Sequence, residues 1–370
     1  MSQPLVEVRG LTRYFAQRGG LFLRRSQYVH ALERVNLTVR QGETLGVVGE
    51  SGCGKTTLGR CIVRLIEPTA GEVLFEGVNL LTLSRQEMQQ RRRDMQMVFQ
   101  SPYSSLDPRF SVLKLIAEPI VTHTDLKGKA LMARVEELLA RVGMEGDYLY
   151  RYPHEFSGGQ LQRIAVARSL ALNPRFLVLD EPTSALDVSV QAQILNLLQQ
   201  LQRELGLTYL FISHDLSVVQ HISNRIAVMY LGRVVELSTT DGIFYGAHHP
   251  YTEALLSSTP VLDPALRRER IILEGSVPSP ANPPSGCRFH PRCPKVMPIC
   301  SQVEPELEDI GGGHLVACHL VSGGNIETIL SPRAKRSGAK GLLATSVRDS
   351  SLHSVPLRMT SSCLVESRRT

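Results

Sequence analysis

The sequence contains no run of about 18 apolar residues, the length at which a helix becomes able to cross a membrane. Its first residues, MSQPLVEVRG, also lack the apolar region of a secretion signal. These two absences predict a protein that is neither membrane-spanning nor secreted. Its seven cysteines would then meet a reducing cytosol, where disulfides are rare and clustered thiols indicate metal binding.

Most of the chain also lacks a net charge. The formal charge of +6 arises in residues 331–370, where eight basic residues outnumber two acidic ones, and the rest of the chain is balanced. We therefore expect no basic face for nucleic acid on the folded part. The segment 321–370 is rich in serine, glycine and basic residues, a composition that predicts a disordered tail.

A glycine-rich segment between a predicted strand and a predicted helix indicates a phosphate-binding loop. Residues 49–57 read GESGCGKTT and follow the apolar run LGVV, and apolar residues then recur at helical spacing. The glycines let consecutive backbone N–H groups turn toward one phosphate at the positive end of a helix. Lysine would reach the β- and γ-phosphates, and the following threonine would ligate Mg²⁺. The predicted nucleotide contacts here are Gly49, Ser51, Gly52, Gly54, Lys55, Thr56 and Thr57.

An aromatic residue upstream of this loop can stack on the adenine base, because stacking tolerates any base. Phe15 is the first choice and Tyr14 the second, although a core position explains either residue equally well.

A second anion site is predicted where FSGGQ, at 156–160, precedes another helical stretch. Ser157 can cap that helix, and Gly158 and Gly159 expose backbone N–H groups at its positive end. A chain with one phosphate loop binds one nucleotide, so the second site needs another use. We predict a head-to-tail dimer in which Ser157, Gly158, Gly159 and Gln160 contact the nucleotide held by the partner.

Polar residues follow three apolar strands: Gln100 after MQMVF, Asp180 and Glu181 after FLVL, and His214 after 208–212. Ligands bind at the carboxyl ends of parallel strands. Asp180 and Gln100 would contact Mg²⁺, Glu181 would act as general base, and His214 would contact the γ-phosphate or the attacking water. Taken alone, a solvated glutamine or a structural histidine would be the commoner interpretation.

Together these motifs resemble those of ATP-binding cassette (ABC) ATPases, over about residues 4–240. GESGCGKT resembles the Walker A loop, FSGGQ the signature, FLVLDE the Walker B strand and SALD the D-loop, with Gln100 in the Q-loop and His214 as the switch histidine. The resemblance implies ATP hydrolysis with Mg²⁺. It also implies an α/β fold, in which an ABC-type P-loop NTPase core carries a helical subdomain at about 101–170 and an antiparallel β subdomain.

Four further segments resemble the ATPase subunits of bacterial dipeptide/oligopeptide importers: SPYSSLDPR, RYPHEFSGGQ, HHPYTEALL and SVPSPANPPSGCRFHPRCP. The resemblance implies an ATPase domain at 1–262, an importer-type C-terminal region at 263–320 and the basic tail. It further implies a peripheral position on the cytoplasmic face of the inner membrane. The implied partners are a related second ATPase subunit, two transmembrane permease subunits and, indirectly, an external peptide-binding protein.

Two other functions remain open at this point. Relatives with the same engine import nickel chelates, glutathione or other solutes, and the engine does not touch the cargo. Soluble ABC proteins of translation or DNA repair usually carry tandem cassettes or long arms, which this chain lacks.

Four cysteines stand together in the C-terminal region: Cys287, Cys293, Cys300 and Cys318. The residues between them show little apolar periodicity, so a metal centre would supply the missing constraint. Four thiolates suit a [4Fe–4S] cluster, which the resemblance also implies, whereas zinc or reduced thiols without metal are the alternatives. We expect this region to be separate from the ATP-binding core.

Overall fold

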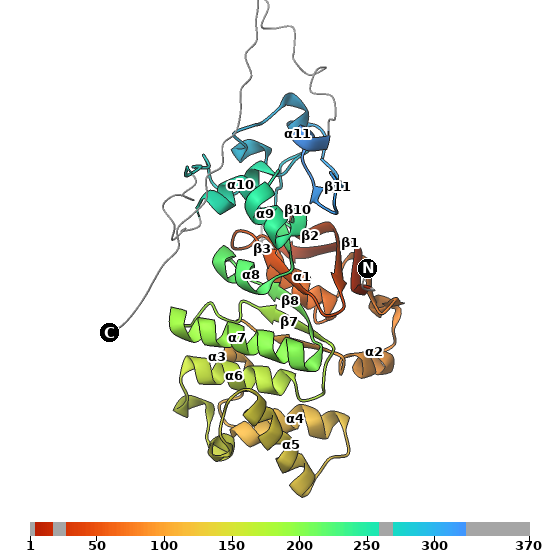
Figure 1. Ribbon diagram of the computed structural model, residues 1–370. Helices are drawn as coiled ribbons and strands as arrows, with labels where there is room; N and C mark the ends of the chain where they lie inside the picture. The colour runs from red at the N-terminus through yellow and green to blue at the C-terminus, as the bar shows by residue number, and fades with distance from the viewer. Residues whose placement is uncertain (1–3, 18–26, 259–268, 323–370) are drawn as a thin grey trace, which may run out of the picture. The chain divides into compact units, whose positions relative to one another are not determined.

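The computed structural model describes residues 4–17, 27–258 and 269–322, all of which belong to one compact unit (Figure 1). The predicted tail lies outside the described residues, except that the helix α11 (His319–Ser322) includes its first two residues. The predicted boundary at 262 also lies outside them, so the domain limits stay a prediction.

A parallel sheet forms the centre of the molecule, as the apolar runs predicted. Its strands are ordered β9-β3-β8-β7-β6, and each pair of neighbours is parallel. The strands β3, β7 and β8 are buried along their whole lengths, which explains their continuous apolar sequences. The bounds are β3 (Thr44–Val48), β6 (Met95–Val98), β7 (Phe176–Asp180), β8 (Thr208–Ile212) and β9 (Arg225–Tyr230).

Helices pack against this sheet through their apolar faces. The long helix α7 buries its leucine and isoleucine side chains at helical spacing and ends at Gly206, which adopts the left-handed conformation of a C-cap. The helices around the sheet are α1 (Lys55–Ile62), α2 (Arg85–Arg91), α7 (Val188–Leu205), α8 (Leu216–Ile222), α9 (Thr240–Gly246) and α10 (Pro250–Ser257).

An antiparallel sheet of order β2-β1-β4-β5 confirms the predicted β subdomain. Its buried valine and leucine side chains share a core with Leu45 and Val47 of β3, so this sheet packs on the strand that precedes the phosphate loop. Its strands are β1 (Pro4–Gln17), β2 (Gln27–Arg40), β4 (Ala70–Phe75) and β5 (Val78–Asn79).

A helical layer confirms the predicted helical subdomain, whose bounds at about 101–170 stay a prediction. Its helices are α3 (Pro102–Ser105), α4 (Val112–His123), α5 (Gly128–Arg141) and α6 (Gly158–Ser169). The helices α4, α5 and α6 gather at the end of the molecule away from the C-terminal elements (Figure 1). Because α6 begins at the second predicted anion site, this layer sets the direction in which that site faces.

The C-terminal region is not separate from the core, which corrects the sequence-based expectation. After β10 (Arg233–Thr239), the short strands β12 (Leu315–Val316) and β11 (Glu308–Asp309) extend the central sheet, with β12 pairing to β10. Phe289 is 1% exposed and belongs to the main apolar core. This region therefore gains burial from the ATPase core, which its own sequence could not supply.

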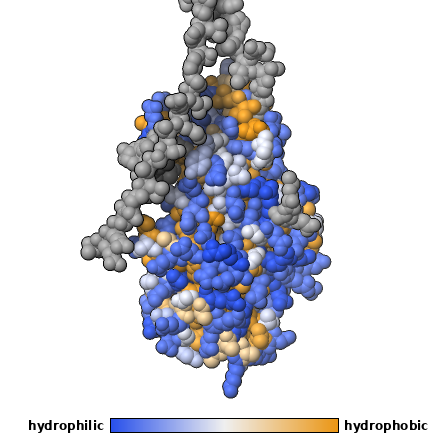
Figure 2. Space-filling model, viewed as in Figure 1, coloured by the Kyte–Doolittle hydropathy of each residue, from blue (hydrophilic) through white to orange (hydrophobic). Residues whose placement is uncertain are grey.

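The face seen in Figure 2 is largely hydrophilic, with hydrophobic residues showing in separate patches between hydrophilic ones. Among the described residues, no helix is long and apolar enough to cross a membrane.

Candidate nucleotide site

The phosphate loop leaves β3 and enters α1 in a conformation that needs glycine at two positions. Gly49 has a φ of 149° and Gly54 a φ of 107°. A Cβ atom on Gly49 would lie 2.2 Å from the Met229 carbonyl oxygen, and one on Gly54 would lie 2.3 Å from that of Ala31. The loop therefore packs directly on neighbouring backbone, which fixes its path.

Lys55, the first residue of α1, folds across this loop. Its side chain is buried, and Nζ donates to the carbonyl oxygens of Gly49 at 2.7 Å and Glu50 at 3.0 Å. Ser51 and Gly52 are exposed at the tip of the loop, whereas Thr57 is half-buried. The ammonium group thus lies inside the loop, where its hydrogen bonds can switch from backbone carbonyl oxygens to phosphate oxygens.

Thr56 and Asp180 meet beside the loop, although 124 residues separate them. Thr56 Oγ1 donates to Asp180 Oδ1 at 2.8 Å, and the other carboxylate oxygen, Oδ2, is buried without a hydrogen-bond partner in the described residues. Burial raises the pKa of Asp180, which the hydrogen bond from Thr56 opposes. A buried carboxylate oxygen that lacks a hydrogen-bond donor is suited to ligate Mg²⁺. Thr56 and Asp180 therefore fit the predicted metal.

Gln100, Glu181 and His214 also converge, as their positions after strands predicted. Gln100 Nε2 donates to Glu181 Oε2 at 2.9 Å, and His214 Nδ1 lies 3.2 Å from the same oxygen. Glu181 has a φ of 46°, a strained conformation for a residue with a side chain, and its N–H donates to the Ile212 carbonyl. A carboxylate held in this way can accept a proton from a water molecule.

The two aromatic candidates differ in their contacts. The Tyr14 hydroxyl donates to the Glu33 carboxylate at 2.7 and 2.8 Å. Phe15 is half-buried on β1, and the Arg13 guanidinium lies 4.5 Å from its ring centroid. Its stacking on adenine stays a prediction.

The segment in which a second anion site is predicted begins the helix α6. The Ser157 hydroxyl accepts from the Gln160 N–H, and the Gln160 amide oxygen accepts from the Ser157 N–H, which makes a capping box. Ser157 is exposed, and Gly158 and Gln160 are half-buried. Gly159 is buried against Val190, and a Cβ atom on Gly159 would lie 2.4 Å from the Val190 side chain. Contact with a partner's nucleotide stays a prediction.

The four clustered cysteines line one cavity of about 10 Å³ together with His290 and His319. Burial raises the pKa of Cys287, Cys293 and Cys318, to about 11 for Cys318, and the neighbouring cysteines add to each shift. Within the described ranges, however, no group of three or more His, Cys, Asp or Glu side chains is arranged to hold a metal ion. The sequence thus predicted the proximity of the cysteines, whereas a metal centre stays unsupported by their present arrangement.

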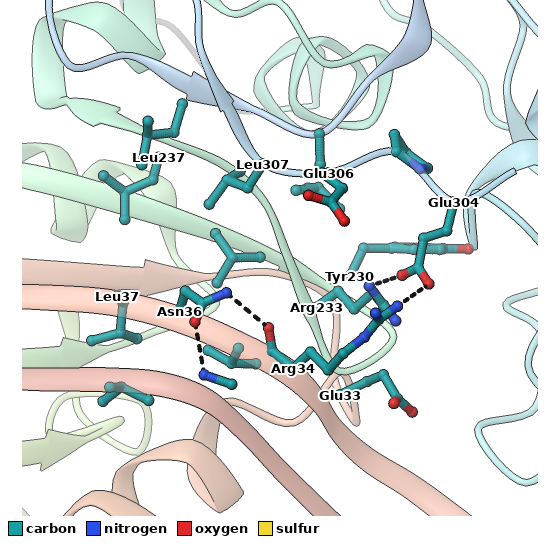
Figure 3. A pocket seen from close by; sticks show the side chains of 18 of the residues that line it. Glu33, Arg34, Asn36, Leu37, Tyr230, Arg233, Leu237, Glu304, Glu306 and Leu307 are labelled. Carbon is teal, nitrogen blue, oxygen red and sulfur yellow. Dashed lines mark hydrogen bonds and ion pairs between the residues drawn. The ribbon is translucent and has the colours of Figure 1, made fainter. Parts of the chain in front are cut away.

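A larger cavity, of about 560 Å³, lies between β1, β2, β10 and the C-terminal region (Figure 3). Arg34 and Arg233 both form ion pairs with Glu304, from Arg34 Nη2 at 2.7 Å. Arg288 similarly pairs with Glu33 at 3.1 Å. These arginines are each paired with a glutamate of the same wall, and none of the predicted nucleotide contacts lines the cavity.

The sequence analysis missed one group of residues beside the phosphate loop. Arg292, from the cysteine region, forms an ion pair with Glu50 of the loop at 3.0 Å, and the Tyr251 hydroxyl accepts from the Glu50 N–H at 2.9 Å. Glu50 itself is the one local signal, because a carboxylate inside a phosphate-binding loop requires a neutralising partner.

Comparison with protein-family models matches residues 32–184 to the family described as ABC transporter. Residues 235–300 match the family described as Oligopeptide/dipeptide transporter, C-terminal region. The oligopeptide transport ATP-binding protein AppF of Bacillus subtilis (strain 168) is 51% identical over 323 residues, covering 86% of this chain and 98% of the relative. The dipeptide transport ATP-binding protein DppF of Escherichia coli (strain K12) is 50% identical over 321 residues, covering 87% and 96%.

Solved structures of ABC cassettes share the fold of this chain. A dimeric post-hydrolysis state of the ATP-binding cassette MJ0796, bound to ADP and Pi, is 31% identical, with a TM-score of 0.57 over 64% of this chain and 98% of its own. CbiO1 from Clostridium perfringens, part of the ABC transporter complex cbiONQ, is 28% identical, with a TM-score of 0.57 over 66% and 92%.

Proposed function

The chain belongs to the family of ABC transporter ATP-binding proteins that carry the oligopeptide/dipeptide C-terminal region, and we propose that its ATP hydrolysis energises the import of short peptides. The protein is an ATPase that uses ATP and Mg²⁺. The convergence of Gln100, Glu181 and His214 beside the Thr56–Asp180 pair is the observation that supports ATP hydrolysis at this site. Peptide cargo is supported by the names of the relatives and by the C-terminal match.

In the proposed mechanism, the backbone N–H groups at Gly49 to Gly54 and the Lys55 ammonium bind the phosphates, with Ser51 and Thr57 completing the contacts. Thr56, Asp180 and Gln100 would hold Mg²⁺, which neutralises phosphate charge when it is bound. Glu181 accepts the proton of the attacking water. Gln100 orients Glu181 through its hydrogen bond to Oε2, and His214 lies against the same oxygen, from where its exposed edge reaches the γ-phosphate.

We further propose that Phe15 stacks on adenine and that Ser157, Gly158, Gly159 and Gln160 contact the nucleotide of a related second ATPase subunit. The dimeric cassette with which this chain shares its fold supports a partner ATPase. The complete assembly would include two permease subunits, with an external peptide-binding protein acting indirectly. Its ATPase subunits would lie peripherally at the cytoplasmic face of the inner membrane.

Transport by the reconstituted assembly tests this function. The chain, its related ATPase, the permease pair and the binding protein in proteoliposomes should accumulate a labelled dipeptide only when Mg²⁺ and ATP are present on the ATPase side. Labelled glutathione and a nickel chelate serve as competing cargoes. Uptake of one of these without peptide uptake would overturn the peptide assignment while leaving the ATPase intact.

For the cysteines, we propose a metal centre held by Cys287, Cys293, Cys300 and Cys318, with a [4Fe–4S] cluster as the first candidate and zinc as the second. Their shared cavity supports the proposal. Because the described side chains form no ready metal site, the thiols would have to approach one another further on binding.

Anaerobically purified protein is therefore expected to contain about four irons per chain, with the visible absorption of a cluster. Replacing Cys300 by Ser should remove the iron and make residues 276–320 more sensitive to protease. The control is Cys363→Ser, which replaces a cysteine outside the group of four and should change neither property. Stoichiometric zinc without iron would reject the cluster and assign the site to zinc. Four readily alkylated thiols in the native protein would reject both metals.

A further inference from the structure

A short segment of the cysteine region lies against the phosphate loop. Residues 287–293 contain two arginines, the buried Arg288 and the half-buried Arg292, which contact different parts of the ATPase core. Arg288 donates to the Leu231 carbonyl oxygen and pairs with Glu33. Arg292 pairs with Glu50, at 3.2 Å from Oε1 and 3.0 Å from Oε2. The cysteine region, for which the sequence predicts no contact with the ATP-binding core, thus contacts the phosphate loop directly.

Every polar group of Glu50 is engaged. Its carboxylate binds Arg292, its N–H donates to the Tyr251 hydroxyl, and its carbonyl oxygen accepts from Lys55 Nζ. Arg292 Nη1 also lies 3.4 Å from the Tyr230 hydroxyl, and the Arg292 side chain is only 9% exposed. The backbone of Glu50 is therefore held by Tyr251 and Lys55, whereas its carboxylate is held by Arg292.

An aromatic cluster gives this contact a rigid base. Tyr230, at the end of β9, lies 4.7 Å from Tyr251 of α10, measured between ring centroids. Phe289, from the same short segment as Arg292, lies 5.3 Å from Tyr230 and 5.5 Å from Tyr251. All three side chains are buried. The segment cannot move away from the loop without opening this cluster.

The charge of Glu50 explains why the contact matters for nucleotide binding. A carboxylate within a phosphate-binding loop repels the triphosphate, and the repulsion is strong where solvent screening is weak. The Arg292 guanidinium neutralises this carboxylate through Nη1, which lies within hydrogen-bond distance of both carboxylate oxygens.

We propose that Arg292 is a positioning residue for ATP binding, which neutralises Glu50 and holds the phosphate loop in its binding conformation from the C-terminal region. The inference rests on the proposed nucleotide site. It adds a residue that acts through Glu50 and does not itself need to touch ATP.

Equilibrium binding of the non-hydrolysable analogue AMP-PNP to the full-length protein tests the proposal. Arg292→Met should weaken binding by about 5- to 150-fold, the range typical of coupling between sites. The loss should shrink as the salt concentration rises, because it arises from an uncompensated charge. In ATPase assays, KM for ATP should rise while kcat changes little.

The double variant provides the sharper test. Glu50→Gln in the Arg292→Met protein removes the uncompensated charge and should restore affinity to within about threefold of Glu50→Gln alone, because contacting residues are not additive. The control Lys295→Met removes another cation of the same region, which pairs with Glu253 at 2.7 Å, and should leave affinity unchanged.

Two outcomes would overturn the inference: wild-type affinity in Arg292→Met, or a double variant as weak as Arg292→Met with no dependence on salt. If a thermal melt shows that Arg292→Met is poorly folded, the affinity of the double variant is compared with that of Glu50→Gln over a range of salt concentrations. The proposal predicts the same salt dependence for both, because neither carries the Glu50 charge, and different dependences would contradict it. Failure of the wild-type protein to bind AMP-PNP would instead refute the nucleotide site on which the inference rests.

Discussion

Replacing Glu181 by Gln is expected to lower ATP turnover by about 10²- to 10⁴-fold while ATP still binds. The amide keeps the shape of the side chain, and its oxygen can still accept from Gln100, which lies 2.9 Å from the native carboxylate. It cannot accept the proton of the attacking water. The variant should therefore remain in the closed dimer with ATP trapped.

The measurement is single-turnover hydrolysis by the variant paired with its partner ATPase, beside ATP retention after rapid gel filtration. Glu76→Gln is a matched control, because Glu76 is another glutamate with a positive φ, of 51°, and it pairs with Arg91 away from the site. The control should hydrolyse ATP at the wild-type rate. Near-normal turnover by the Glu181 variant would refute its assignment as general base.

The parts of the site that follow one another along the chain could be predicted from the sequence. The phosphate loop is local, since its glycines and Lys55 all lie within a few residues of one strand end. The convergence of Gln100, Glu181 and His214 is also predictable, although they are far apart in sequence. Parallel strands bring their carboxyl ends to one edge, so residues directly after different strands become neighbours.

The attachment of the C-terminal region could not be predicted in this way. The strand β12 is two residues long and carries no alternation that would identify it, yet it pairs with β10. Arg292 lies 242 residues from Glu50, and no periodic pattern connects them. The weak apolar periodicity between Cys287 and Cys318 predicts a segment without a core of its own. Phe289 shows that the segment instead shares the core of the ATPase domain.

The use of the second anion site depends on another chain and is equally hidden from local patterns. The capping box at Ser157 satisfies the first turn of α6 within one chain, so the fold alone is consistent with a purely structural role. Two variants that fail at different stages can separate these possibilities.

Lys55→Ala is expected to weaken ATP binding by about 100-fold or more, because it removes charge-assisted bonds to two phosphates. Ser157→Arg should instead leave ATP affinity of the monomer unchanged and abolish ATP-dependent dimerisation, because Ser157 serves the partner's nucleotide. Lys129→Ala, on the exposed surface of α5, is the control for loss of a lysine and should retain both properties.

Equilibrium ATP binding under monomeric conditions and sedimentation of the ATP-bound proteins measure the two stages separately. Loss of monomer affinity in Ser157→Arg equal to that in Lys55→Ala would place Ser157 at the nucleotide of its own chain and refute the head-to-tail arrangement. Normal dimerisation of Ser157→Arg would leave the residue with its capping role alone. Retained affinity in Lys55→Ala would show that the backbone N–H groups of the loop suffice to hold the phosphates, since the buried ammonium, bonded to Gly49 and Glu50, would then serve the loop and not its ligand.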